Sequence, residues 1–303
     1  MPARIALLAC TDAMDLDTDG PFLFPALDAA GLEYDVVAWD DPKAKWASYT
    51  KVILRATWDY FTRLDEFRAV LEHITSQTEL LNPLEVVEWN VDKRYVTELR
   101  QASLPVVDTA FVSHLMPPTE LLNALTRIGR WRCVEVVVKP TVSAGSNDTY
   151  RLDAGDGSAI AKAVQSIVDS DRVAMVQPYL AGVDSYGERG CVYFNGSFDH
   201  AFAKAALLLP GAQSVDGLFV PEEIEPADLS VEERAAADAV NSWLTDRFGP
   251  LLYARIDLVP GVGGPQVLEV ELIEPSFFFD SDPSSATRFV ELLGTGSGVT
   301  GDR

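Results

Sequence analysis

The chain has 303 residues, with 24 Lys and Arg against 46 Asp and Glu, so its formal net charge at pH 7 is −22. Its 48% hydrophobic content is that of a folded globular protein, and its length allows two or three lobes with separate cores. A charge this negative repels phosphate backbones and anionic lipid, which argues against a nucleic-acid or membrane partner and means that any bound phosphate needs local cations.

Residues 1–90 alternate apolar β-type runs with helical patterns, which predicts an N-terminal α/β lobe with a parallel sheet. Strands are expected over 5–10, 34–39 and 51–56, and helices over 22–31 and 65–74. Ligands of such sheets gather at the carboxyl ends of the strands. The residues around the end of the third strand are therefore of interest, namely Arg55, Thr57, Trp58, Asp59 and Tyr60.

Residues 91–182 form a second expected lobe. Helices are predicted over 91–102, 121–128 and 158–170, and strands over 104–112, 133–140, 150–152 and 174–180. The third expected lobe, 183–303, contains a hairpin over 190–206 that turns at Asn195-Gly196, a dipeptide that suits the turn between twisted strands. A helix over 232–248, strands over 252–259 and 266–273, and a helix over 285–293 complete it.

The Gly-rich tail from Gly294 is expected to be mobile. It contains a formal G-x-G-x-x-G over 296–301. A dinucleotide fingerprint needs a strand before it and a helix after it, and here the chain ends, so we assign it no function.

The first group of residues with chemical potential surrounds Lys139. Three valines on a buried strand lead to this lysine, and small or polar residues around Gly145 follow it. Small side chains let backbone N–H groups approach an anion, and the ammonium supplies positive charge, which favours a phosphate site. An ordinary hairpin with a lysine at its mouth explains the pattern equally well.

The second group is a set of carboxylates near the C-terminus. Glu269 and Glu271 are two residues apart on a strand and so project from one face, while Asp257 and Arg255 lie on the expected partner strand. Carboxylates that share a face repel, and Mg²⁺ with its preference for oxygen ligands suits the space between them. A solvated acidic strand is the alternative, but the apolar surroundings in LIEPSFFF make unpaired carboxylates costly.

The third group, residues 174–188, runs from an apolar strand into an extended segment fixed by Pro178. Its backbone could bind a purine edge, and Asp184 or Glu188 could accept hydrogen bonds from ribose hydroxyls. A domain linker is the competing interpretation.

The order of these groups along the chain resembles that of the ATP-grasp superfamily, closest to its glutathione synthetase and ribosomal-protein glutamate ligase branch. The groups are Lys93, Lys139 with its loop, the segment QPYL, and the carboxylates Asp257, Glu269 and Glu271. The strings ATWDY, WNVDKRY, KPTVSAG, YARIDLV and ELIEPS are similar to the subgroup that includes the D-cycloserine-forming cyclo-ligase. The resemblance covers nearly the whole chain. It implies an α/β ATP-grasp fold, in which an N-terminal parallel lobe precedes two α+β lobes that clamp the nucleotide.

The resemblance also implies roles for individual residues. Those expected to contact ATP are the phosphate-binding Lys93 and Lys139, the flap residues Ser143, Ala144 and Gly145, the adenine hinge Gln177, Tyr179 and Leu180, and Asp184 or Glu188 at the ribose. Those expected to bind two Mg²⁺ ions are Asp257, Glu269 and Glu271. Arg255, with Lys204 and Arg189, is expected to stabilise the transferring phosphoryl group. Many relatives have Glu-x-Asn where this chain has Glu269-x-Glu271, a change that adds negative charge and keeps an oxygen ligand.

The implied reaction activates a substrate carboxylate as an acyl phosphate, which an amine then attacks. In the subgroup named above the substrate is O-ureido-D-serine and the product is the D-cycloserine ring. The candidates for binding the amino acid are Asp12, Arg55, Asp59, Glu274 and Ser276. For Asp12, Arg55 and Asp59, a structural role at a strand end or turn is an equal alternative. An intermolecular amino-acid or peptide ligase and a nucleotide sensor without turnover are the rival functions.

The chain has three cysteines, Cys10, Cys133 and Cys191, with no C-x-x-C pair. This usage is typical of a reducing cytoplasm rather than of a disulfide scaffold, and the N-terminus lacks the pattern of a signal peptide. A homo-oligomer is compatible with the sequence.

Overall fold

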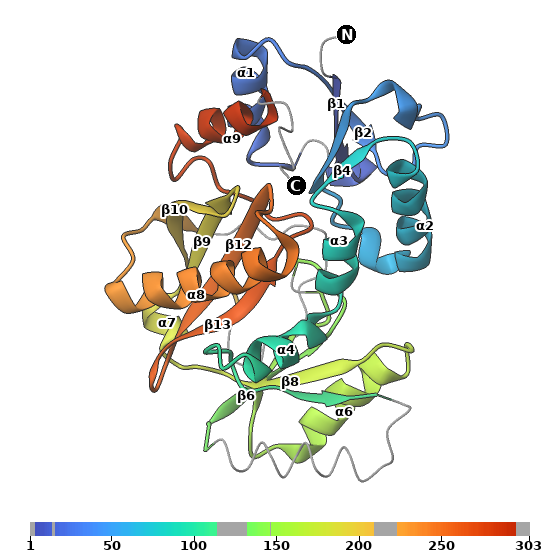
Figure 1. The fold of residues 1–303 in the computed structure, drawn as a ribbon. Helices are drawn as coiled ribbons and strands as arrows, with labels where there is room; N and C mark the ends of the chain where they lie inside the picture. The colour runs from blue at the N-terminus through green and yellow to red at the C-terminus, as the bar shows by residue number, and fades with distance from the viewer. Residues whose placement is uncertain (1–3, 14–15, 114–131, 146, 209–222, 295–303) are drawn as a thin grey trace.

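The structure is a computed structural model of the chain, and it describes residues 4–13, 16–113, 132–145, 147–208 and 223–294. Three β-sheets follow one another along the chain (Figure 1). Within the described residues, no helix is long and apolar enough to cross a membrane. The helix predicted over 121–128 and the tail beyond residue 294 lie outside these residues.

The first sheet is parallel, as predicted, with strand order β2-β1-β3-β4. Its strands are β1 (Arg4–Ala9), β2 (Glu33–Ala38), β3 (Lys51–Ala56) and β4 (Glu79–Leu81). Ala6 and Leu8 of β1 pack in one core with α2 (Leu64–Thr75), while Ile5 and Leu7 pack in another with α1 (Gly20–Ala29) and α9 (Ser285–Gly294). This division follows from the two-residue alternation of side chains along a strand.

The second sheet is antiparallel, with order β5-β8-β6-β7. It consists of β5 (Ala110–Val112), β6 (Glu135–Pro140), β7 (Tyr150–Asp153) and β8 (Ala174–Pro178), and α6 (Gly157–Val168) packs on it. The predicted strand over 104–112 is shorter than expected. Val106 bridges to Val267 of the third sheet and only 110–112 pair with β8, because this segment crosses from one sheet to the other.

The helix predicted over 91–102 is broken into two parts. A 3-10 turn (Lys93–Tyr95), whose start is capped by the Asp92 side chain, precedes α4 (Val96–Gln101). An unpredicted helix, α3 (Leu84–Asn90), comes just before them. Lys93 therefore lies on a tight turn at a junction between helices.

The third sheet has order β11-β10-β9-β12-β13. Its strands are β9 (Glu188–Phe194), β10 (Ser197–Lys204), β11 (Ile224–Pro226), β12 (Tyr253–Gly261) and β13 (Gly264–Glu271), and the short α7 (Val183–Tyr186) precedes β9. Asn195 and Gly196 both have positive φ, which confirms the predicted turn of the β9–β10 hairpin. Helix α8 (Val231–Phe248) begins at a capping box between Ser230 and Glu233 and ends at Gly249, as predicted.

The predicted lobe boundaries, between residues 90 and 91 and between 182 and 183, fall between strands of different sheets. The division into three lobes stays a proposal, since the C-terminal segment packs on the first sheet. Phe277 and Phe289 share a core with Ile5 and Leu23, and Figure 1 shows α9 beside α1. The first strand and the last described helix are thus parts of one core.

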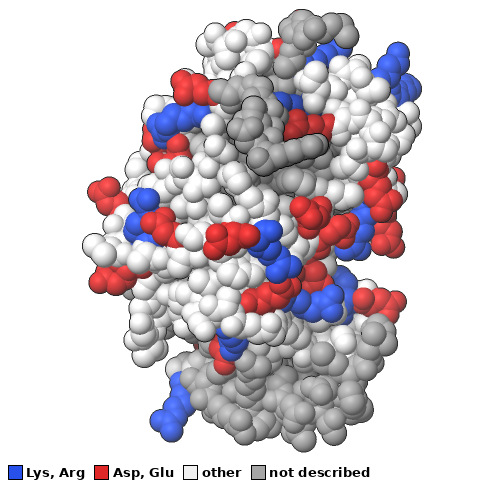
Figure 2. Space-filling view, viewed as in Figure 1, with Lys and Arg blue, Asp and Glu red and all other residues white. Residues whose placement is uncertain are grey.

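On the face drawn in Figure 2, Lys and Arg side chains lie among Asp and Glu side chains. The described residues on this face form no extended basic patch.

Candidate active site

A cleft lies between the second and third sheets, and residues next to the first sheet close one end of it. Among the described residues, four cationic side chains line it: Lys93, Lys139, Lys204 and Arg255. The same part of the chain also contributes five carboxylates: Glu188, Asp257, Glu269, Glu271 and Glu274. The cleft therefore combines groups that bind phosphate with groups that bind metal, although the protein as a whole is strongly acidic.

The β12–β13 hairpin supplies most of the carboxylates. Asp257 pairs with Glu269 and Arg255 pairs with Glu271 across the two strands, and a bulge follows Asp257. No register shift separates Glu269 from Glu271, so both project from one face of β13 as predicted, although Val270 between them also contacts the cleft. The bulge disturbs the alternation, so Leu268 also lines the cleft beside Glu269.

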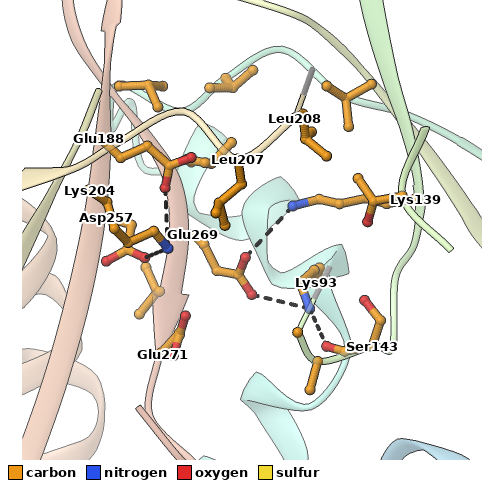
Figure 3. Close-up of a pocket in the computed structure, with 18 of the residues that line it drawn as sticks. Lys93, Lys139, Ser143, Glu188, Lys204, Leu207, Leu208, Asp257, Glu269 and Glu271 are labelled. Carbon is orange, nitrogen blue, oxygen red and sulfur yellow. Dashed lines mark hydrogen bonds and ion pairs between the residues drawn. The ribbon is translucent and has the colours of Figure 1, made fainter. Parts of the chain in front are cut away.

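Two lysines from the other side of the cleft converge on Glu269 (Figure 3). Lys93 Nζ lies 3.1 Å from one carboxylate oxygen and Lys139 Nζ lies 3.7 Å from the other. Lys93 Nζ also donates to the carbonyl oxygen of Ser143 at 2.9 Å, which ties the start of the loop 141–145 to the 3-10 turn. The predicted phosphate-binding lysines and loop are therefore brought together with the predicted metal carboxylate.

The charges in the cleft shift one another. Burial raises the pKa of Glu269, but Lys93 and Lys139 outweigh it and hold that pKa well below its usual range. Burial lowers the pKa of Lys139, and only part of this shift is offset by Glu269. Burial also raises the pKa of Glu271, with repulsion from Asp257 and Glu269 adding to it and Arg255 opposing it. Glu269 is thus well supplied with positive charge, whereas Glu271 is not.

Arg255 binds two of these carboxylates. Its Nε and Nη2 each lie 2.9 Å from an oxygen of Asp257, and Nη2 also contacts Glu271. Lys204 Nζ lies 3.5 Å from Glu188 and 3.9 Å from Asp257. Among the described residues, no three His, Cys, Asp or Glu side chains form a ready metal cluster. The donors nevertheless suit Mg²⁺, since they are carboxylate oxygens and the half-buried Glu271 is short of positive charge.

The other end of the cleft is apolar and suits a purine. Val107, Val183, Leu207, Leu208 and Leu268 line it with the predicted hinge residues Gln177, Tyr179 and Leu180. Gln177 is 2% exposed, its amide donates to Thr109 Oγ1, and its side-chain oxygen has no partner among the described residues. The sequence did not indicate Leu207 and Leu208, because nothing in their spacing relates them to strand β8.

Of the two residues predicted for the ribose, only Glu188 lines the cleft. Asp184 is held by Arg151, which lies 2.8 Å away, and by the hydroxyl of Tyr179. Arg189 is also outside the cleft, since it follows Glu188 on β9 and projects from the opposite face of the strand. Its guanidinium stacks on Tyr186 and donates to the carbonyl oxygens of Tyr186 and Glu188.

The residues predicted to bind the amino acid divide into two sets. Glu274 and Ser276 line the cleft, whereas Asp12, Arg55 and Asp59 do not. Asp12 is exposed on a 3-10 turn after β1. Asp59 accepts a hydrogen bond from the indole N–H of Trp39 at 2.7 Å and pairs with Arg63 at 3.1 Å. Both of its carboxylate oxygens therefore bind residues of the N-terminal lobe.

Three aromatic side chains line the cleft near Glu274 and Ser276. They are Trp58 and Tyr60, which follow β3, and Phe278. Burial and repulsion from Glu271 raise the pKa of the neighbouring Glu274 to about 8. Trp58 and Tyr60 could be expected at a ligand site because they follow a strand of a parallel sheet. Nothing in the sequence indicated that Phe278 lines the cleft.

Solved ATP-grasp ligases share this architecture. The D-alanine–D-alanine ligase of Bacillus anthracis in complex with ATP matches with a TM-score of 0.68 at 16% identity, over 96% of this chain and 94% of that one. The ATP-grasp ligase PsnB with its minimal precursor, Mg and ADP matches with a TM-score of 0.61 at 18% identity, over 95% of this chain and 96% of that one. The protein therefore has the predicted ATP-grasp fold.

A more specific similarity covers nearly the whole chain. Cycloserine biosynthesis protein DcsG of Streptomyces lavendulae is 32% identical over 298 residues, which is 95% of this chain and 97% of that protein. A crystal structure of D-cycloserine synthetase DcsG matches with a TM-score of 0.87 at 31% identity, over 96% of this chain and 99% of that one. The family model for the N-terminal domain of D-cycloserine synthetase DcsG matches residues 5–82. The chain belongs to the DcsG family and is an ATP-grasp ligase.

Proposed function

We propose that this enzyme uses ATP to close O-ureido-D-serine to D-cycloserine. The observation that carries the proposal is the match of residues 5–82 to the N-terminal domain of D-cycloserine synthetase DcsG, within a similarity that covers 95% of the chain. The ATP-grasp fold is common to ligases of different substrates. The N-terminal lobe, which contributes Trp58 and Tyr60 to the cleft, favours this member of the class.

ATP would lie with its adenine in the apolar end of the cleft and its phosphates toward Lys93 and Lys139. The backbone after Val176 is extended. The backbone N–H of Tyr179 already donates to the backbone carbonyl oxygen of Glu135, so Gln177 and Leu180 would contact the base. Glu188 is the proposed ribose ligand. Ser143, Ala144 and Gly145 would form the flap over the phosphates.

Asp257, Glu269 and Glu271 would hold Mg²⁺, with two ions as the proposed number. When bound, the metal neutralises charge on the phosphates during transfer. The chain's own cations act at the same place. Lys139 and Arg255 would stabilise the phosphoryl group as it passes from ATP to the substrate carboxylate, and Lys204 would do so from β10.

The transfer breaks the bond between the β–γ bridging oxygen and the γ-phosphorus and forms an acyl phosphate and ADP. The ureido nitrogen that is bonded to oxygen in the same substrate molecule then attacks the acyl carbon, its proton is lost, and phosphate leaves. Water would hydrolyse the acyl phosphate, so the cleft has to stay closed until the ring has formed. The bond from the ring nitrogen to its carbamoyl group is then hydrolysed by water, which gives D-cycloserine and carbamic acid, and the carbamic acid decomposes to carbon dioxide and ammonia. Trp58, Tyr60 and Phe278 would exclude water, while Glu274 and Ser276 would orient the substrate.

The test is ADP release with ATP, Mg²⁺ and O-ureido-D-serine as the sole amino acid, with mass spectrometry of the product. We expect ADP and a cyclic product without a second amine. ADP release only when two amino acids are present would indicate an intermolecular ligase. No release with amino acids of either hand would indicate a nucleotide sensor, a function that the intact lysines and carboxylates of the cleft argue against.

We also propose a reducing compartment, the cytoplasm, for this enzyme. Cys10, Cys133 and Cys191 are all free, and Cys10 and Cys191 are buried. Burial raises the pKa of the Cys191 thiol, which suits a structural rather than a reactive cysteine.

A further inference from the structure

The segment 274–279, which follows β13, is held mainly by side chains that donate to or accept from its backbone. Trp58 donates to the carbonyl oxygen of Glu274, Arg55 to that of Pro275 and Arg255 to that of Ser276. His200 Nε2 donates to the carbonyl oxygen of Phe277 at 2.8 Å. The segment has no strand partner, so these contacts decide where its side chains point.

Asp19 and Arg55 form the most buried part of this arrangement. Asp19 has no exposed surface and Arg55 is 4% exposed, and Arg55 Nη2 lies 2.7 Å from Asp19 Oδ2. The same oxygen accepts from Phe277 N–H at 2.6 Å, and Asp19 Oδ1 accepts from Phe279 N–H at 3.0 Å. The guanidinium of Arg55 also lies over the Phe277 ring, 4.1 Å from its centre.

Phe278 lies between the two amides that Asp19 holds. It has a φ of +52°, a left-handed conformation that is uncommon for a bulky residue and has to be imposed by its surroundings. Phe278 lines the cleft, as do Glu274 and Ser276 on the same segment. The two hydrogen bonds from Asp19 therefore hold the backbone on both sides of a strained residue that faces the site.

We infer that Asp19 and Arg55 are positioning residues for the amino-acid end of the cleft, acting through the segment 274–279 without lining the cleft themselves. This inference rests on the proposed function, because it assigns that end to the amino-acid substrate. Arg55 was predicted from the sequence to bind the substrate's charged end. Its placement instead makes it a support for the residues that would contact the substrate.

Two conservative variants test this role. In Asp19→Asn one carboxylate oxygen becomes an NH₂ group, which cannot accept, so at least one of the Phe277 and Phe279 amides loses its acceptor. Arg55→Lys keeps the positive charge, but a lysine ammonium lacks the planar guanidinium whose separate nitrogens bind Asp19 and the carbonyl oxygen of Pro275. For both, we expect the KM for the amino acid to rise roughly tenfold or more and the KM for ATP to change by less than about twofold.

Asn82→Ala is the matched control. Asn82 has no exposed surface and donates to the carbonyl oxygens of Tyr253 on β12 and Leu272 just after β13, and none of its hydrogen bonds within the described residues is to 274–279. Asn82→Ala should destabilise the fold without changing the ratio of the two KM values. An equal rise in both KM values, or an unchanged amino-acid KM in folded Asp19→Asn and Arg55→Lys, would overturn the inference.

Backbone amide exchange separates this inference from the proposed function. In the wild type the amides of Phe277 and Phe279 should be protected, and in Arg55→Lys or Asp19→Asn they should exchange roughly tenfold faster while amides of β6 and β8 do not change. Unchanged exchange in the variants would refute the positioning role of Asp19 and Arg55. If exchange is faster in the variants but the wild type does not turn over O-ureido-D-serine, the proposed substrate is refuted and the positioning role is retained. The KM comparison is then made with the amino acid that supports ADP release.

Discussion

Arg151 on β7 lies 2.8 Å from Asp184 on α7, and this pair joins the second sheet to the start of the third. The other nitrogens of Arg151 bind Glu135 on β6, and Nη1 also donates to the carbonyl oxygen of Leu208. Its guanidinium carbon lies 3.6 Å from the centre of the Tyr179 ring. One buried cation thus contacts the hinge, a neighbouring strand of the second sheet, the helix that leads into the third sheet and a residue of the apolar end of the cleft.

Arg151→Ala should therefore weaken nucleotide binding as well as stability. We expect the KM for ATP to rise about tenfold and the free energy of unfolding to fall by about 1–3 kcal/mol, since Glu135 and Asp184 lose a charged partner. Steady-state kinetics and urea unfolding measure the two effects. Arg68→Ala, which breaks an exposed pair with Glu88, should change neither beyond about 0.5 kcal/mol. An unaltered KM for ATP in Arg151→Ala would show that Arg151 does not contribute to nucleotide binding.

The placement of the charged side chains of β12, β13 and β6 in one cleft could be predicted because local periodicity determines it. A strand presents every second residue to one face, so Glu269 and Glu271 had to lie together, and a short hairpin turn fixes Asp257 opposite Glu269. Lys139 is delivered to the cleft by the valine run that precedes it. The parallel sheet, the β9–β10 turn and the limits of α8 were predictable for similar local reasons.

Asp184 and Arg55, which the sequence assigned to ligand binding, do not line the cleft, because their partners come from distant parts of the chain. Asp184 is 33 residues from Arg151, and Arg55 is 220 residues from Pro275, so neither contact has a signature in local spacing. Both residues carry charge near the expected site and were assigned to the ligand for that reason. Tertiary pairing decided that they bind other residues of the protein.

Lys139→Ala should weaken ATP binding. Lys139 lies in the cleft, half-buried, with its ammonium directed to Glu269, so its loss removes a cation where the phosphates are proposed to lie. We expect the dissociation constant for ATP to rise roughly tenfold to a hundredfold, measured by calorimetry with Mg²⁺ present. Lys162→Ala, on the exposed side of α6, is the control. Equal affinity in wild type and Lys139→Ala would remove Lys139 from the phosphate site.

Glu269→Gln and Glu271→Gln should each impair Mg²⁺-dependent ADP formation while the protein stays folded. Each removes a charge that the metal is proposed to need, and we expect kcat/KM to fall roughly a hundredfold. The two should differ in one respect. Glu269→Gln also frees Lys93 and Lys139 of their carboxylate, so its affinity for ATP without metal should rise relative to that of Glu271→Gln. Wild-type turnover in both variants would contradict the metal assignment.

Glu274→Gln should change how stability depends on pH. The pKa of Glu274 is raised from 4.5 to about 8, first by burial and then by repulsion from Glu271. Between these values the folded protein holds a proton that the unfolded chain releases, so the contribution of this group to stability is complete below pH 4.5 and is lost as the pH rises through about 8. Glutamine has no such titration. In urea unfolding without Mg²⁺ or nucleotide, Glu274→Gln should match the wild type near pH 5 and exceed its stability by about 1–3 kcal/mol at pH 8. Glu72→Gln, an exposed carboxyl on α2, serves as the control, and its difference from the wild type should stay constant over this range. A constant difference for Glu274→Gln as well would mean that Glu274 is ionised in the folded protein and that its negative charge is balanced within the cleft.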